Sequence, residues 1–553
     1  MPTVAEIIKR MLPSGTSWKG RRPDWKKVPF WPPDLFAVAA TLVNVSGCYA
    51  QPHYLCGFED DCPYDADYRT DIEGLGEKYG DGLVPDEVQQ LWDVLWKQPW
   101  PIDGGRKKCG EWWDAAMRLL AIADEASVGV GFADRERKRL IAYKVFQALK
   151  AEAVLGEKRL PHVPHSLCIY VSPNEACVQP KTRTPQIGCT LRSLSHNLAL
   201  LPPVGEVKTT WRYGTSAEDD SEEPLNVLLI PFPYEIRGDS FIGRPNNETQ
   251  ASPRAAFFDI EQQWLKGVTA VKFAAFIQEL IEAGKREVQN IHAVVLPEAA
   301  LEREMAKDVA HILSHEEKLE IFISGIVDKK KKGTPPRNRT FSTLFHNGAP
   351  LARWRQSKHH RWKLDEYQIR RYNLGHVLGK RKSWWEGIDV ASRRCHFYVF
   401  RNGASMAVLI CEDLARIDPV QAVVRAVGPN LVIALLMDGP QLERRWPGRY
   451  ATVLADDPGS AVLTLTSLGL IRRSSMPSEK GNRSIALWKE TLGTARELEL
   501  PDGCLSLLLT LSPEKEENVT SDGRSDRCAT TKLSLTSVIG LKLAQAPKWL
   551  HAV

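Results

Sequence analysis

Residues 405–413, SMAVLICED, decide the fold. The run is short and apolar, and it ends abruptly in Cys411, Glu412 and Asp413, which is typical of a buried strand with polar side chains at its carboxyl end. In open α/β sheets, ligands and reacting groups are typically placed at the carboxyl ends of strands. Cys411 is therefore a candidate nucleophile.

The sequence on both sides of this strand alternates between strands and helices. Residues 225–232, LNVLLIPF, form a compact apolar run, residues 259–284 have the pattern of a long amphipathic helix, and residues 291–300, IHAVVLPEAA, are a second buried strand. Further apolar runs continue as far as LSLLLTL at residues 505–511. This alternation predicts an α/β domain with a well-buried sheet.

The remaining sequence differs from this domain in its hydrophobic spacing and its polarity. The segments EVQQLWDVLW (87–96) and EWWDAAMRLLAIADEA (111–126) have helical spacing, whereas SPEKEENVTSDGRSD (512–526) is polar and resembles a linker. The expected division is a mainly helical N-terminal module at 1–160, a connecting segment with short strands at 161–221, the α/β domain at 222–512, and a polar linker and C-terminal tail at 513–553.

Composition limits the classes of partner and compartment. The 553 residues include 73 basic and 68 acidic side chains, and a net charge of +5 is too small to indicate a nucleic acid or a membrane. Eleven cysteines are a sparse and odd set, which predicts mostly free thiols in a reducing compartment. The longest apolar run, Phe36 to Val45, is about half of the roughly 20 residues that span a bilayer, so we expect a cytoplasmic protein.

Three strand-like segments end in residues that could act together. Glu298 closes HAVVLPE, Lys358 follows LARWRQS, and Cys411 closes MAVLIC. The glutamate could accept the thiol proton, the lysine could stabilise the thiolate and an oxyanion, and the thiol could attack a carbonyl or nitrile carbon. The sequence thus predicts a nucleophilic hydrolase, provided that the three segments converge.

The order and context of these residues resemble the nitrilase, or carbon–nitrogen hydrolase, superfamily. VVLPEAAL resembles the family's glutamate motif, ARWRQSKHHRWKLDEYQIRRY its lysine motif, and VLICEDLAR its nucleophile motif, with Asp413 two positions after the cysteine. The CED form and the KHH…DE…RRY string are similar to the glutamine-hydrolysing domains attached to NAD synthetases. The Ser-Gly-Gly signature of their synthetase domain does not occur in this sequence, so NAD synthesis is not expected.

The resemblance covers about residues 222–512 and implies a four-layer α-β-β-α sandwich. It implies Glu298 as base, Lys358 as oxyanion stabiliser and Cys411 as nucleophile. A second glutamate that orients the substrate would correspond to Glu366, and the backbone N–H of Glu412 would be a second oxyanion donor. The implied reaction is hydrolysis of a small-molecule amide or nitrile through a thioester.

Several alternatives remain open at this stage. Lys363 competes with Lys358 as the active lysine, and the extra segment GHVLGKRKSWWEGID (375–389) is expected to form a loop at the pocket mouth. His311 and His315 have metal-ligand spacing on a predicted helix, but no third ligand accompanies them, so no metal or other cofactor is expected.

A second function class fits the same sequence. The nitrilase fold could serve as a sensor, scaffold or effector within a multi-protein system, such as a bacterial defence system, without ordinary amidase turnover. The N-terminal module would then bind a protein partner. We also expect a homo-oligomer, because family members often associate through the helix after the nucleophile, here Leu414–Val427.

Overall fold

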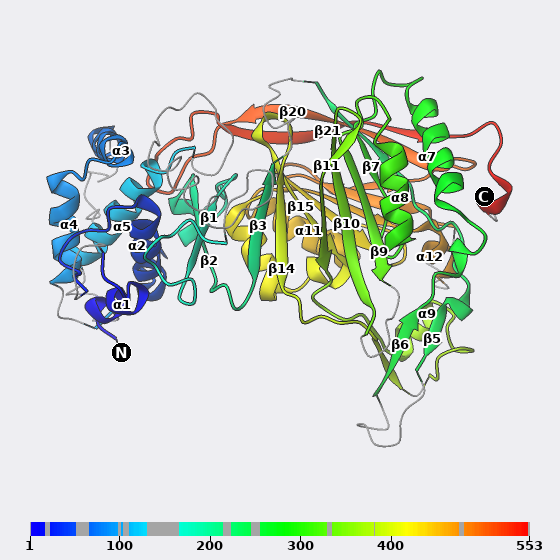
Figure 1. The fold of residues 1–553 in the computed structure, drawn as a ribbon, viewed down its shortest axis with the longest axis horizontal. Coiled ribbons are helices and arrows are strands. Elements are labelled where there is room, and N and C mark those ends of the chain that lie inside the picture. Colours follow the sequence, from blue (N-terminus) through cyan, green and yellow to red (C-terminus); the bar gives the residue numbers. More distant parts are fainter. Residues whose placement is uncertain are drawn as a thin grey trace.

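The computed structural model describes residues 2–16, 23–50, 66–97, 101–102, 110–129, 165–213, 223–244, 255–328, 335–380, 382–474 and 481–550. A helical N-terminal module lies at one end of a larger body built on two sheets (Figure 1). Among the described residues, no helix combines the length and the apolar character needed to cross a bilayer.

The first sheet contains the strand that precedes Glu298. Its strands lie in the order β11-β10-β9-β7-β4-β20-β21, and the short β8 pairs with β9. The bounds are β4 Leu225–Leu229, β7 Ala293–Val295, β8 Leu301–Glu302, β9 Ile321–Asp328, β10 Arg337–His346, β11 Ala349–Ser357, β20 Ser506–Glu516 and β21 Thr530–Leu541.

The second sheet contains the strand that precedes Cys411. Its order is β19-β18-β17-β16-β15-β14-β3, with β15, β16 and β17 parallel at its centre. The bounds are β3 Lys208–Tyr213, β14 Arg394–Val399, β15 Ser405–Ile410, β16 Leu431–Leu436, β17 Ala461–Thr466, β18 Ser484–Lys489 and β19 Arg496–Glu499.

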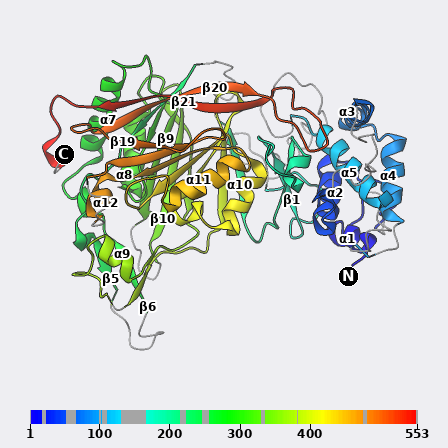
Figure 2. The same ribbon diagram turned by 180° about the vertical axis from the view of Figure 1, so that it is seen from behind.

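Both faces of the second sheet are buried, which explains its continuous apolar strands. Along β16, Leu431, Ile433 and Leu435 pack with the first sheet, whereas the alternate residues pack with helices α10 (Ala422–Val427) and α11 (Trp446–Asp456). Helices α7 (Ala270–Gly284) and α8 (Arg303–Leu313) pack with the first sheet. Figure 2, seen from behind, shows α10 and α11 over the opposite face. The fold is the expected α-β-β-α sandwich.

A smaller sheet projects from one edge of the body (Figure 1). Its order is β12-β13-β6-β5, with bounds β5 Phe241–Gly243, β6 Ala255–Ile260, β12 Lys363–Leu364 and β13 Ser383–Glu386; helix α9, Glu366–Arg371, follows β12. Strand β13 belongs to the segment 375–389 that was expected to be a plain loop. That expectation is corrected, because the aromatic pair of SWWE favours a strand.

The N-terminal module is helical where the structure describes it, as predicted. Its helices are α1 Val4–Met11, α2 Pro32–Ser46, α3 Ala66–Gly80, α4 Asp86–Trp96 and α5 Gly110–Glu125. Asp34, in the first turn of the buried helix α2, accepts backbone N–H bonds from Ile169, Tyr170 and Val171 at 2.9–3.2 Å. One carboxylate thus ties this module to the connecting segment.

The connecting segment is part of the sandwich as well as a link to it. It contains the strand pair β1 (Cys177–Pro180) and β2 (Leu198–Leu201), and its last strand, β3, pairs with β14 in the second sheet. Thr182 N–H donates to Val427 O at 2.9 Å, and Val423, Val424 and Val427 are buried in the same apolar cluster as the N-terminal module. Much of the segment Leu414–Val427 therefore packs against the chain itself, whereas Arg416, Ile417 and Asp418 within it are exposed. The association of two copies through this segment stays a prediction.

The C-terminal region requires a second correction. Residues 513–553 were expected to be a linker and tail, but β20 and β21 form a long antiparallel ribbon at the edge of the first sheet. The alternating Leu533 and Leu535 of β21 are buried, and this period of two was hidden by the polar residues around it. The ribbon extends from the body to the N-terminal module (Figure 1).

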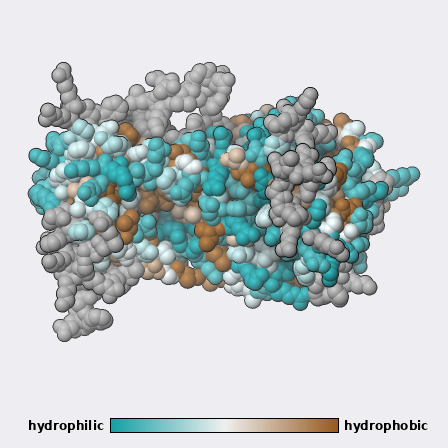
Figure 3. Space-filling view, turned by 90° about the horizontal axis from the view of Figure 1, so that it is seen from below, coloured by the Kyte–Doolittle hydropathy of each residue, from teal (hydrophilic) through white to brown (hydrophobic). Residues whose placement is uncertain are grey.

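The surface seen from below is mainly hydrophilic, with apolar side chains scattered over it (Figure 3). Exposed large apolar side chains such as Ile417, Val271 and Leu492 come from separate elements. Isolated apolar residues of this kind are normal on a folded protein.

Candidate active site

The two facing sheets bring together the three residues that the sequence singled out. Cys411 directly follows β15, Glu298 comes three residues after β7, and Lys358 directly follows β11. The relative exposures of Cys411, Glu298 and Lys358 are 2%, 2% and 0%. The charges of Glu298 and Lys358 both act on the Cys411 thiol, so the three groups share one buried site.

Lys358 is held between two carboxylates. Its Nζ donates to Glu298 Oε1 at 2.8 Å and to Glu386 Oε2 at 2.8 Å. Asn338 Nδ2 bridges the same two glutamates, at 2.7 Å from Glu298 Oε1 and 2.8 Å from Glu386 Oε1. We call Glu298, Lys358, Glu386 and Asn338 the candidate catalytic cluster; its hydrogen bonds leave the lysine little freedom to move.

Glu298 retains one oxygen for chemistry. Its Oε1 is bound by Lys358 and Asn338, but its Oε2 is buried and has no hydrogen-bond partner among the described residues. A buried carboxylate oxygen without a partner is costly, so such atoms are rare in structural positions. The free oxygen is suited to accept a proton from a neighbouring group.

The backbone is strained at Cys411 and directly after Glu298. Cys411 has a φ of 46°, and Ala299, directly after Glu298, has a φ of 56°. Residues other than glycine adopt this left-handed region at a cost, and such strain gathers at active sites. A side chain at Gly325 on β9 would lie 2.4 Å from Glu298 Cα, so this glycine permits the close approach of the Glu298 loop to the strand.

Asp413 fixes the backbone that follows Lys358. Its carboxylate accepts the N–H of His359 and of His360 at 3.1–3.2 Å and contacts the Nδ1 of each ring at 3.0 Å. Burial alone would raise the pKa of Asp413, but the two histidines lower it below its usual value. The acidic residue of the CED motif therefore connects the nucleophile turn to the lysine loop.

The protonation states suit a base-assisted thiol. Burial, followed by the charge of Glu298, raises the pKa of Cys411 well above its usual value, although Lys358 opposes this effect. Burial also raises the pKa of Glu298. Burial alone would lower the pKa of Lys358, but Glu298 and Glu386 raise it. The resting site thus holds a neutral thiol and a firmly protonated lysine.

The structure places two of the sequence candidates away from the cluster. Glu366 begins α9, its side chain is 57% exposed, and it pairs with Arg370. Lys363 lies on the surface, with its ammonium 5.4 Å from the centre of the Trp385 ring. The expectation for Glu366 is corrected, because Glu386 is the second glutamate that contacts Lys358.

Sequence reasoning missed Glu386 because it lies in the extra segment 375–389. The available signal was a glutamate at the end of a short aromatic run, SWWE, the same strand-then-acid pattern that identified Glu298. Its Oε2 also accepts the backbone N–H of Trp362 at 3.1 Å, so the smaller sheet is tied to the cluster. Glu412 directly follows the nucleophile, and its side chain pairs with Arg416 at 2.9 Å.

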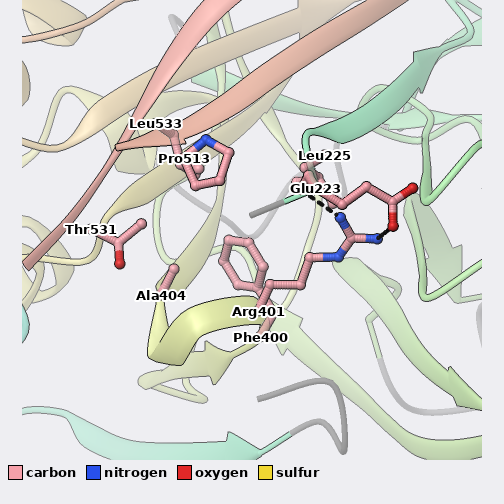
Figure 4. Close-up of a pocket in the computed structure, with 8 residues that line it drawn as sticks. All are labelled: Glu223, Leu225, Phe400, Arg401, Ala404, Pro513, Thr531 and Leu533. Carbon is pink, nitrogen blue, oxygen red and sulfur yellow. Dashed lines mark hydrogen bonds and ion pairs between the residues drawn. The ribbon is translucent and has the colours of Figure 1, made fainter. Parts of the chain in front are cut away.

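One pocket is lined by residues outside this site. A small pocket is lined by residues that include Glu223, Phe400, Arg401 and Thr531, where Arg401 donates to Glu223 O (Figure 4). Among the described residues, no three His, Cys, Asp or Glu side chains are grouped to hold a metal ion.

Comparisons with known proteins find similarity among solved structures and not among sequences. No family model matches the sequence, and no curated protein matches it. Among solved structures, Saccharomyces cerevisiae Nit3, a member of branch 10 of the nitrilase superfamily, is similar with 13% identity and a TM-score of 0.32, over 53% of this chain and 91% of that one. A carbon–nitrogen hydrolase from Helicobacter pylori G27 is similar with 13% identity and a TM-score of 0.27, over 49% of this chain and 83% of that one.

A glutamine-dependent NAD+ synthetase from Acinetobacter baumannii is also similar, with 12% identity and a TM-score of 0.31 over 58% of this chain. The match spans 49% of that synthetase. The chain itself shows an α-β-β-α body with a buried Glu-Lys-Glu cluster. Because these TM-scores are low, the chemistry of this chain is inferred from its own site geometry.

Proposed function

We propose that this protein is a carbon–nitrogen hydrolase that cleaves an amide or a nitrile through a thioester on Cys411. The observation that carries the proposal is the free Oε2 of Glu298 beside a lysine that two carboxylates hold in place. This arrangement supplies a base and a cation beside a strained cysteine, which nucleophilic acyl transfer requires.

In the first half of the reaction, Cys411 Sγ attacks the carbonyl carbon while Glu298 accepts the thiol proton. A base is needed because the high pKa of Cys411 keeps it a thiol. The C–N bond then breaks, and Glu298 returns the proton to the leaving nitrogen, so ammonia or an amine departs and a thioester remains.

Lys358 and the backbone N–H of Glu412 would stabilise the negative charge on the substrate oxygen. Lys358 is suited to this role because Glu298 and Glu386 keep it protonated. Preorganised donors of this kind typically contribute about 10²–10³ in rate each. Glu386 would act as a positioning residue, since it holds Lys358 and does not need to contact the substrate.

In the second half, Glu298 takes a proton from water as the water attacks the thioester. The acid leaves and the thiol recovers its proton from Glu298, which restores the resting site. A nitrile enters one step earlier, because its thioimidate adds water and loses ammonia to give the same thioester.

The test is a Cys411→Ala variant assayed for ammonia release from a panel of amides, ureas and nitriles. We expect turnover by the parent protein, none by Cys411→Ala, and an acyl adduct on Cys411 in the mass spectrum of the quenched parent. The matched control is Cys395→Ala, since Cys395 is also buried, on the neighbouring strand β14. Equal turnover by Cys411→Ala and the parent would rule out the proposal.

The alternative function is a nitrilase-fold sensor, scaffold or effector whose N-terminal module binds a partner. The burial of the cluster favours it, because Cys411 and Lys358 are covered in this state. The same two variants distinguish the hydrolase from the sensor. A sensor would form no acyl adduct, and iodoacetamide would alkylate its Cys411 no faster than Cys395. Its biological activity would be unchanged in Cys411→Ala.

A further inference from the structure

Asp438 is a buried carboxylate beside the nucleophile that the proposed mechanism does not use. In the parallel pairing of β15 and β16, Ile410 lies opposite Leu435, so the chain leaves both strands at the same edge. Cys411 follows one strand and Asp438 lies just beyond the other. The negative charge of Asp438 acts on the Cys411 thiol, which places the two groups in one site.

One half of Asp438 is held firmly. Its Oδ1 accepts the hydroxyl of Tyr372 at 2.6 Å and a guanidinium N–H of Arg445 at 2.6 Å. Its backbone N–H donates to Thr466 Oγ1 at 3.3 Å, and that hydroxyl donates to Asp438 O at 2.6 Å. These contacts fix the position of the carboxylate.

The other half of Asp438 lacks a partner. Its Oδ2 is buried and has no hydrogen bond from any residue that the structure describes. Tyr372 and Arg445 already bind Oδ1, so the residue does not need Oδ2 for its place in the fold. Because leaving a buried carboxylate oxygen unpaired is costly, the atom is suited to a donor that arrives with a ligand.

The charges around Cys411 indicate the sign of the charge that the ligand carries. The candidate catalytic cluster contains two glutamates and one lysine. Two further carboxylates are neutralised by arginines, Asp438 by Arg445 and Glu412 by Arg416. The sum is negative by about one charge when both glutamates are ionised. The guanidinium of Arg445 is bound to Asp438 and to Pro440 O, so its donors are not offered to an anionic ligand in this state.

We propose that the substrate carries an amino group, protonated at neutral pH, that donates to Asp438 Oδ2 while the scissile carbon lies at Cys411 Sγ. This inference rests on the proposed hydrolase function and names its substrate class as amides or nitriles of amino-bearing compounds. Asp438 is thus a specificity-determining residue, and Tyr372 and Arg445 hold it in position.

The test compares ligands that differ only at one end. The ammonium series is 3-aminopropanamide to 5-aminopentanamide; the neutral matches are butanamide to hexanamide, and the anionic match is succinamate. Binding is measured by calorimetry on a Cys411→Ala background, and ammonia release on the intact enzyme. We expect at least one ammonium ligand to bind about 10- to 100-fold more tightly than its neutral match, the range for a charge-assisted hydrogen bond.

Asp438→Asn is the matched variant, because the asparagine oxygen can still accept from Tyr372 and Arg445 while the free carboxylate oxygen becomes an amide nitrogen. We expect it to remove the preference for the ammonium ligand over its neutral match. If this variant does not fold, the ligand series on the parent background still decides. A neutral or anionic match that binds as tightly as every ammonium ligand overturns the inference, whether or not ammonia is released. Asp438-dependent binding without ammonia release supports the recognition but refutes the hydrolase.

Discussion

Two buried charge clusters of this protein contain similar residues. They differ in whether every buried side-chain atom has a hydrogen-bond partner. In the candidate catalytic cluster, Lys358 lies between Glu298 and Glu386. In the loop between β20 and β21, Arg524 is fully buried and pairs with Asp124 at 3.3 Å, Glu125 at 2.7 Å and Asp522 at 2.9 Å. We call this second group the junction cluster, because it joins the ribbon to the N-terminal module.

The difference lies in which atoms remain unpaired. In the junction cluster, none of the described side-chain atoms is buried without a partner; Asp124, for example, also accepts three backbone N–H groups from residues 196–198. In the active site, Glu298 Oε2 and Asp438 Oδ2 are both unpaired. A buried ionic cluster is therefore not in itself a sign of catalysis; the free acceptor atoms distinguish the two.

The largest effect is expected from Arg524→Met. This change leaves the junction carboxylates buried without their cation, which typically costs about 3–5 kcal/mol in the free energy of unfolding. The measurement is urea unfolding. The matched control is Arg527→Met in the same loop, because the Arg527–Glu73 pair is largely exposed and is worth less than about 1 kcal/mol. Equal effects of the two variants would show that the junction cluster contributes no special stability.

A smaller effect, and one on activity, is expected from Glu386→Gln. Losing one anionic contact lets Lys358 shift, and a misplaced catalytic group can cost about 10²-fold in rate. The paired control is Glu366→Gln, whose exposed carboxylate contacts Arg370 and should leave kcat within twofold or so of the parent. If Glu366→Gln lowers kcat as much as Glu386→Gln, the sequence-based assignment of the second glutamate would be restored.

The sequence predicted the sandwich and singled out three residues of the candidate site because each depends on local pattern. The buried strands before Glu298 and Cys411 can be seen as apolar runs followed by a reactive side chain, and Lys358 follows the strand-like LARWRQS. The motif order then resembled one family, and that family implied the layers. The helical module was visible for the same reason, since helices α4 and α5 have clear amphipathic spacing.

The features that were missed depend on long-range pairing. Glu386 reaches the site only because β13 pairs with β6, more than a hundred residues earlier in the chain. Strand β21 is anchored by β20 and by Arg524, whose partners lie about 400 residues away. The polar residues of 512–526 therefore suggested a linker, although Asn518, Thr520, Asp522 and Arg524 among them are buried. No local pattern contains that information.

Asp413→Asn tests the hydrogen bonds by which Asp413 holds the backbone that follows Lys358. Like the junction cluster, this contact is a buried carboxylate whose acceptors are paired. The variant loses the charge that accepts the N–H groups of His359 and His360, and a hydrogen bond to a charged group is worth about 1.5–3 kcal/mol. We expect that loss in urea unfolding together with a lower kcat, since Lys358 precedes the loop that Asp413 holds. Asp389→Asn, which removes a partly exposed acceptor, is the control. A stability loss with an unchanged kcat would show that these hydrogen bonds do not position Lys358.

The smallest effect is a shift in pH dependence that separates Glu298 from Asp413. Asp413 has a pKa below 3.8 in the folded state, so its contribution to stability is present above about pH 3.8 and is lost as the pH falls through the folded pKa. Glu298 has a pKa above 4.5, so its contribution is present below about pH 4.5 and is lost as the pH rises through the folded pKa.

The free carboxylate of Glu298 is nevertheless the form that can accept the thiol proton, so kcat/KM should rise as the pH increases through that raised pKa. Because the charge of Glu386 contributes to raising the pKa of Glu298, Glu386→Gln should move this rise to lower pH. The measurement is the pH profile of kcat/KM for the parent and the variant. A rise centred at the ordinary value of 4.5 in the parent, or one that does not move in Glu386→Gln, would mean that another group is the base.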